Sequence, residues 1–185
     1  MKVREAAQDR RSIRKYKDIP VEKDKIEIML DSARLAPSGS NTQPARWMVI
    51  QNRHTIHRIC KACRDQPFVK EAPLVLVLLG DLSCRLGEAE GERDILSDQY
   101  REERERIIRD CAISGQQMVL QAFELGIGTC WVGDFTQLSM RKALNIPSDH
   151  YILAIFTAGY PDEKPSPRQR HSLKSVVCFE EFKRK

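Results

Sequence analysis

The sequence contains few aromatic residues, and most of them lie in apolar runs. Aromatic residues make up 6% of its 185 positions. A module that binds single-stranded nucleic acid combines exposed aromatic residues with basic ones, because the bases stack on the rings. The formal charge of +5, from 31 basic and 26 acidic residues, is also smaller than such a module usually carries. We therefore expect no nucleic-acid partner, and a non-enzymatic basic module that binds nucleic acid or a phosphorylated ligand is the weaker alternative.

A long apolar run and an N-terminal leader are also lacking. The run from Leu74 to Leu79 is far shorter than the ~20 residues that a membrane helix needs. Met1 to Glu5 leads straight into charged residues, with no apolar stretch behind it. We expect a cytoplasmic protein with no membrane partner.

Disulfides are not expected, although the sequence has six cysteines. A chain without a secretion signal stays where thiols are kept reduced. Cys60 and Cys63 form a C-x-x-C motif, which would suit half of a zinc site or a redox pair, yet no second pair at metal-ligand spacing follows it. We interpret the pair as a coincidence of spacing on a helix surface and expect no metal.

No repeat, low-complexity tract or Gly/Ser linker divides the chain. Its length and its 41% of hydrophobic residues suit one core and are too small for two comfortable domains. We predict a single domain over residues 1–185. The stretch from Arg85 to Arg106 mixes charges of both signs, and we interpret it as a solvated helix or a mobile excursion.

Helical and strand patterns alternate irregularly, which favours an α+β fold over a doubly wound one. From Glu22, apolar residues at helical spacing predict an amphipathic helix that Pro37 ends. Residues 73–80 predict a strand buried on both faces, at the centre of the sheet. The other predicted strands are residues 47–50, 129–132 and 152–158, and the other predicted helices are residues 55–63 and 136–144.

A long helix is predicted before Gly126, which would end it as a C-terminal cap. Its apolar face is broad for so small a domain to cover alone. This apolar face comprises Ile108, Cys111, Ala112, Met118, Val119, Ala122 and Phe123.

After Lys164 the chain is expected to be extended, with residues 176–179 able to pair at a sheet edge, in this molecule or in another.

Two basic segments and one polar loop are candidates for binding chemistry. Arg10, Ser12 and Arg14 alternate, so in an extended segment their side chains emerge on one face. Guanidinium forks bind phosphate oxygens at two points, and a serine hydroxyl adds a third bond. Arg168 and Arg170 repeat this spacing near the end of the chain, and the loop of residues 37–44 offers small and amide side chains to a heterocycle. Each segment alone also fits a solvated surface.

Together, these segments resemble the nitroreductase family. The resemblance rests on Arg-Arg-Ser-Ile-Arg-Lys-Tyr at residues 10–16, Ala-Pro-Ser-Gly-Ser-Asn-Thr-Gln-Pro at residues 36–44, and Pro-Arg-Gln-Arg at residues 167–170. Residues 125–135, Leu-Gly-Ile-Gly-Thr-Cys-Trp-Val-Gly-Asp-Phe, are similar to the family's segment beside the flavin. The similarity extends from about Val3 to Val177.

The resemblance implies a nitroreductase-like homodimer with FMN at the subunit interface. It implies that Arg10, Arg11 and Ser12 hold the phosphate and ribityl region, that Arg14 reaches the pyrimidine edge, and that Arg168 and Arg170 hold the phosphate. It further implies that Pro37, Ser38, Gly39 and Asn41 touch FMN, in part the partner's, and that the backbone of Val132, Gly133 and Asp134 passes near N5.

The implied activity is an FMN-dependent NAD(P)H oxidoreductase. A hydride would pass from NADH or NADPH through FMN to a small electrophilic acceptor, such as a nitroaromatic or a quinone, by a ping-pong mechanism in one pocket. Because the flavin carries the redox chemistry, no acid–base side chain is expected, and Arg14 is the candidate electrostatic stabiliser. Asp134 and Ala45-Arg46 depart from the family pattern, so a specialised dehalogenase-like or ring-cleaving flavoenzyme is the alternative within the same fold.

Overall fold

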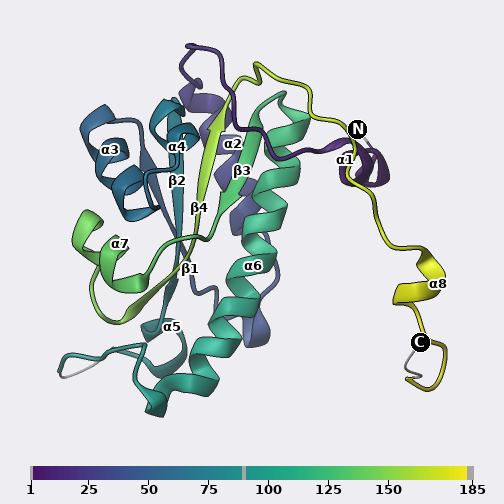
Figure 1. The fold of residues 1–185 in the computed structure, drawn as a ribbon. Helices are drawn as coiled ribbons and strands as arrows, with labels where there is room; N and C mark the ends of the chain where they lie inside the picture. Colours follow the sequence, from purple (N-terminus) through teal and green to yellow (C-terminus); the bar gives the residue numbers. More distant parts are fainter. Residues whose placement is uncertain (1, 89–90, 183–185) are drawn as a thin grey trace.

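The domain is built on a four-stranded antiparallel sheet, seen in a computed structural model that describes residues 2–88 and 91–182 (Figure 1). Each neighbouring pair of strands is antiparallel. This arrangement confirms the predicted α+β class. The strand predicted over residues 73–80 is one of the two middle strands of the sheet, as expected. The strand order is β1 (Ala45–Ile50), β2 (Leu74–Asp81), β4 (His150–Gly159) and β3 (Gly128–Val132).

Both faces of β2 are buried, as the continuous apolar run predicted. Leu74, Leu76 and Leu78 belong to the core shared with α2 (Lys23–Arg34) and α6 (Arg101–Glu124). The alternate residues of β2 pack on the opposite face, in a second core, because successive side chains of a strand point to opposite sides. The helices of that second face are α3 (Arg53–Ala62), α4 (Pro67–Glu71) and α7 (Gln137–Leu144). The sheet is therefore the middle of three layers.

The predicted helices and strands of the domain body are confirmed within a few residues. α2 ends three positions before Pro37, and α7 begins after Thr136, whose hydroxyl accepts a hydrogen bond from the Ser139 N–H at 3.1 Å. A short α-helix, α5 (Ser83–Leu86), and two 3-10 helices, η1 (Gly39–Asn41) and η2 (Asp98–Tyr100), complete the body.

The buried face of α6 differs from the predicted one. Ile107 is fully buried, whereas Ile108, Ala112 and Phe123 are only partly buried. The reason is the close approach of β2 at Gly80, where an added Cβ would collide with Cγ2 of Ile107. Gly126, at φ +77°, follows the helix end as predicted. Although α6 has 24 residues, neither it nor any other helix among the described residues is long and apolar enough to cross a membrane.

The mixed-charge stretch from Arg85 to Arg106 is mostly exposed, and its residues 101–106 form the solvated start of α6, as one of its two interpretations predicted. The part before α6 is nevertheless attached to the domain. Ile95 is fully buried in the core beside α6. Arg104 Nη1 donates to the carbonyl oxygens of Ile95 and Ser97 at 2.7 and 3.2 Å. Because Ile95 is the only buried residue among the described residues of this stretch, its packing leaves no periodic signal in the sequence. Residues 89–90, also part of this stretch, lie outside the described residues.

The N-terminal helix and the chain after β4 lie side by side beside α6, away from the sheet, and the tail then runs on away from the domain body (Figure 1). α1 (Val3–Asp9) is followed by an extended segment, and the chain after β4 runs past it to α8 (Leu173–Val176). The prediction that residues 176–179 pair with this chain's own sheet was wrong, because Val176 closes α8 and no strand forms in residues 177–182. Pairing with another molecule stays a prediction.

Candidate functional site

Arginines from the two ends of the chain line one cavity of about 330 Å³. Arg10, Arg11 and Arg14 follow α1, and the other arginines come from the tail beyond β4. The structure thus brings together all the basic residues that the sequence singled out, with Ser12 among them. We call this set the arginine cluster: Arg10, Arg11, Arg14, Arg168 and Arg170.

The segment that carries the first three arginines is fixed by backbone pairing. The Ile13 N–H donates to the carbonyl of Thr129 in β3 at 3.0 Å. Farther along, the Lys17 N–H donates to the carbonyl of Tyr160 at 2.9 Å. Strand geometry then orients alternate side chains to the same side. The pairing explains why residues so distant in sequence surround one cavity.

The tail contributes one carboxylate to this pairing, which the sequence reasoning missed. Glu163 Oε1 accepts hydrogen bonds from the backbone N–H groups of Arg14, at 2.5 Å, and Lys15, at 3.1 Å. The Asp162 N–H donates to the carbonyl of Lys15 at 2.9 Å. Neither contact follows from a local pattern, because the partners are about 150 positions apart in the chain.

The arginine cluster fits a phosphate group. Burial, with smaller effects from the charges of Arg170 and Arg11, lowers the pKa of Arg10. Arg11 Nε is buried and has no hydrogen-bond partner among the residues that the structure describes. Its Nη1 is engaged, donating to the carbonyls of Gln8 and Arg10 at 2.7 and 2.9 Å. An anion in the cavity would relieve the mutual repulsion and give the orphaned donor a partner.

An apolar cavity of about 670 Å³ adjoins the charged one. Arg10, Arg11, Pro165 and Pro167 line both cavities. Ile13, Phe123, Ile127 and the start of β3 form much of the rest of its wall, which also includes the charged residues Asp9, Glu163 and Lys164. A phosphorylated ligand with a large apolar part would find a charged and an apolar surface next to each other here.

The loop of residues 37–44 lies at the other end of the sheet. Ala45, which follows the loop, pairs with Gly80 of β2, whereas Leu74 of β2 pairs with Ala158, the partner of Thr129. Six residues of extended strand separate these two ends by about 20 Å. Pro37, Ser38, Gly39 and Asn41 are therefore not brought to the arginine cluster of the same chain.

The chain leaves β3 through Val132, Gly133 and Asp134. These residues lie beyond the part of β3 that pairs with Ile13. Val132 is buried, and the next two residues are exposed. Asp134 Oδ1 lies 3.1 Å from Arg64 Nε, with both side chains largely exposed. Such an exposed pair contributes little to stability, so Asp134 is available to a ligand as well.

The C-x-x-C cysteines lie in the core, so their placement on a helix surface was wrong. Cys60 belongs to the buried face of α3, and Cys63 follows that helix and is completely buried. Burial raises the pKa of Cys63 to about 12, and it also raises the pKa of Cys60. Both are packing residues. Among the described residues, no group of three or more His, Cys, Asp or Glu side chains is arranged to hold a metal ion.

Comparison with known proteins agrees with this fold. A protein of Thermus thermophilus named NADH dehydrogenase is 30% identical over 94% of this chain and 94% of its own length. The crystal structure of a nitroreductase family protein of Clostridium difficile is 31% identical, with a TM-score of 0.80 over 98% of this chain and all of its own. A second Clostridium difficile structure, an FMN-dependent nitroreductase, is 29% identical, with a TM-score of 0.76 over 96% of this chain and 98% of its own. Residues 7–160 match the Nitroreductase family, and the chain belongs to that family.

Proposed function

We propose that the chain is an FMN-dependent oxidoreductase that passes a hydride from NADH or NADPH to a small electrophilic acceptor, such as a nitroaromatic or a quinone. The observation that carries the proposal is the arginine cluster, in which residues from both ends of the chain surround one cavity with a buried, unpartnered N–H at Arg11. Relatives named for FMN and for NADH support the choice of cofactor and electron donor.

The arginine cluster would hold the phosphate of FMN. Arg10, Arg11, Arg168 and Arg170 line the cavity with guanidinium forks, and Ser12 adds a hydroxyl. When bound, FMN supplies the two-electron redox chemistry, and the protein supplies binding, orientation and electrostatics. The chain therefore needs no nucleophile or metal of its own for this reaction.

Arg14 is the residue proposed to stabilise the negative charge that reduction leaves on the cofactor. Its backbone is fixed by Glu163, and its guanidinium carbon lies 5.6 Å from the centre of the Phe68 ring. A cation held in advance at the place where charge develops favours the charged state without reorganisation. Replacing Arg14 with alanine should therefore lower the reduction potential of the bound cofactor.

We further propose that the site is completed by a second copy of the chain. The loop of residues 37–44 lies about 20 Å along the sheet from the arginine cluster, estimated from strand geometry, so it would serve the cofactor held by a partner subunit. Ile28 on α2, Leu35 just after α2 and Ile113 on α6 are exposed apolar side chains that such a homodimer would cover.

The proposed reaction alternates between two substrates in one space. The nicotinamide and the acceptor would occupy the same place in turn, which gives ping-pong kinetics. The pocket wall near Asp134 would select the acceptor within the class of small electrophiles.

Cofactor content and turnover test the proposal together. The purified protein should show the visible absorption of a flavin, and FMN should be released on denaturation. With NADH and 1,4-benzoquinone, initial rates should give parallel lines in double-reciprocal plots. A colourless protein that neither binds added FMN nor oxidises NADH would refute the proposal.

A further inference from the structure

The loop of residues 37–44 has a strained backbone. Ser40, Asn41 and Gln43 have φ values of +52°, +54° and +50°, in the left-handed region that non-glycine residues seldom occupy. Three such residues within four positions persist only where the surrounding structure fixes them. Strain of this kind gathers at ligand-binding sites, where it prepares the backbone for its ligand.

Hydrogen bonds within the loop close its turns but do not attach it to the domain. The N–H groups of Asn41 and Gln43 donate to the carbonyl and the hydroxyl of Ser38 at 3.0 and 2.9 Å. At the start of the loop, the Gly39 N–H donates to Asp110 Oδ1 on α6 at 3.2 Å. At the end of the loop, the Asp81 N–H donates to the carbonyl of Pro44 at 2.9 Å, and Arg85 Nη1 donates to Thr42 Oγ1 at 3.4 Å. Neither of these two contacts holds the carbonyl of Gln43.

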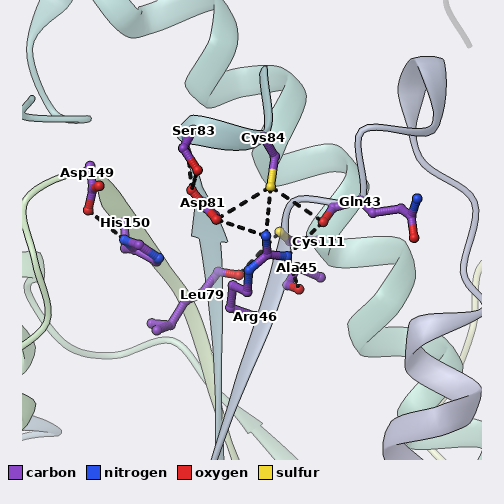
Figure 2. A network of polar contacts seen from close by, with 10 residues as sticks. All are labelled: Gln43, Ala45, Arg46, Leu79, Asp81, Ser83, Cys84, Cys111, Asp149 and His150. Atoms are coloured by element: carbon purple, nitrogen blue, oxygen red, sulfur yellow. Dashed lines mark hydrogen bonds and ion pairs between the residues drawn. The ribbon is translucent and has the colours of Figure 1, made fainter. Parts of the chain in front are cut away.

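Arg46 holds the carbonyl of Gln43, which also receives a longer contact from Cys84 Sγ at 3.8 Å (Figure 2). Its Nη1 donates to the carbonyl oxygens of Gln43 and Ala45 at 2.9 and 3.2 Å. Its Nη2 lies 3.0 Å from Asp81 Oδ2 and donates to Cys84 Sγ at 2.9 Å. The planar guanidinium makes these contacts at once, which an ammonium group could not do.

Asp81 is the buried carboxylate that holds the Arg46 guanidinium in place. It lies at the end of β2, and only 6% of its surface is exposed. Its Oδ1 accepts hydrogen bonds from the N–H and the hydroxyl of Ser83 at 2.9 and 2.6 Å. Burial raises the pKa of Asp81, but the bonds from Ser83 and Cys84 and the charge of Arg46 outweigh it and hold that pKa below its ordinary value. The carboxylate is thus a charged group on the most buried strand of the sheet.

We propose that Arg46 is a positioning residue, which the buried carboxylate of Asp81 orients so that it holds the Gln43 carbonyl and, with it, the strained loop in the shape that contacts FMN. The inference deepens the proposed function and rests on it. It also changes the expected role of Arg46. Because both of its terminal nitrogens are engaged within the chain, its guanidinium acts on the loop and does not reach for the acceptor.

Arg46→Ala and Arg46→Lys test the proposal against Arg53→Ala. Arg53 is a matched control, since its guanidinium also donates to two backbone carbonyls, those of Ala72 and Lys70, at 2.9 and 2.6 Å, away from the loop. The first measurement is hydrogen–deuterium exchange of the amides of residues 38–43 in protein freed of FMN. The second is FMN affinity, from the quenching of FMN fluorescence on titration.

Both Arg46 variants should exchange the amides of residues 41–43 about tenfold faster and bind FMN about tenfold more weakly, as loss of a charge-assisted hydrogen bond implies. Arg53→Ala should change neither quantity. Asp81→Asn should act in the same direction, and Arg46→Ala combined with Asp81→Asn should add little to the larger single effect, because the two residues act as a unit.

The outcomes separate this inference from the proposed function. Unchanged loop exchange in a folded Arg46 variant would overturn the inference, and so would faster exchange with unchanged FMN affinity. A wild-type protein that binds no FMN would instead refute the proposed function, and the claim about FMN contact would fall with it. Rescue by lysine in both measurements would also contradict the inference, since it requires the fork and not the charge alone.

Discussion

Glu163 Oε1 accepts a hydrogen bond from the backbone N–H of Arg14 across 149 positions of sequence, at 2.5 Å. The contact attaches the tail to the segment that carries Arg10, Arg11 and Arg14. It thereby sets the distance between the two halves of the arginine cluster. A residue outside the basic motifs thus controls how those motifs meet.

Replacement of Glu163 should loosen the arginine cluster. We expect Glu163→Ala to lower the free energy of unfolding by about 1 kcal/mol, the usual contribution of one or two hydrogen bonds at a half-exposed site. FMN affinity should fall about tenfold, since the cluster would no longer be preorganised. Urea denaturation and FMN titration measure the two effects. Glu27→Gln, which removes only an exposed pair with Lys23, is the control and should change neither quantity.

Arg170→Ala should lower the melting temperature of the FMN-bound protein but not that of the empty protein. Without an anion, the charge of Arg170 disfavours the charged form of Arg10, so its removal should leave the melting temperature unchanged or slightly higher. With FMN present the same variant should melt lower than wild type, because a phosphate contact is lost. Thermal melts with and without FMN check this. Lys174→Ala is the control, since it removes a basic side chain of α8 that does not line the cavity, and it should melt like wild type in both conditions.

The Asp81 carboxylate makes stability depend on pH in a defined direction. Its folded pKa is held below the ordinary value of 3.8, so its contribution is fully present above that value and is lost as the pH falls through the lower folded value. The free energy of unfolding of wild type and Asp81→Asn should therefore differ most near neutral pH and converge below about pH 4. Urea denaturation between pH 7 and pH 3 measures the difference. A gap that stays constant over this range would show that Asp81 does not act through its charge.

Subunit mixing should reveal whether the loop of residues 37–44 serves a partner. In a mixed dimer, one subunit carries Arg168→Ala and Arg170→Ala, and the other carries Asn41→Gly. If the loop serves the partner, one FMN site combines both defects and the other site is intact. Glycine is chosen because it adopts the positive φ of Asn41 without strain. Statistical mixing should restore about a quarter of the wild-type FMN sites, because half of the dimers are mixed and each has one intact site. If the loop serves its own subunit, mixing should restore none.

The sequence predicted the elements that carry strong local signals. The apolar run of residues 74–79 predicted the central strand, because burial on both faces leaves no polar positions. Helical spacing from Ile26 and the cap at Thr136 likewise predicted α2 and α7. Spacing also identified the arginines of both ends, which the structure brings to one cavity.

Features set by long-range packing were missed or misassigned. The choice of Ile107 over Ile108 depends on the approach of Gly80, and the burial of Cys60 and Cys63 depends on which face of α3 meets the sheet. The contacts of Glu163 and of Arg46 join residues with no shared motif. The distance between the loop of residues 37–44 and the arginine cluster follows from strand register, which no local pattern determines.

The central claim is that this chain binds FMN and moves electrons from a reduced nicotinamide to a small acceptor. Anaerobic titration of the FMN-loaded protein, followed by its visible spectrum, tests it most directly. One equivalent of NADH or NADPH should bleach the flavin absorption, and one equivalent of 1,4-benzoquinone should restore it. A flavin spectrum that neither nicotinamide bleaches, or that stays bleached when the quinone is added, would contradict the account.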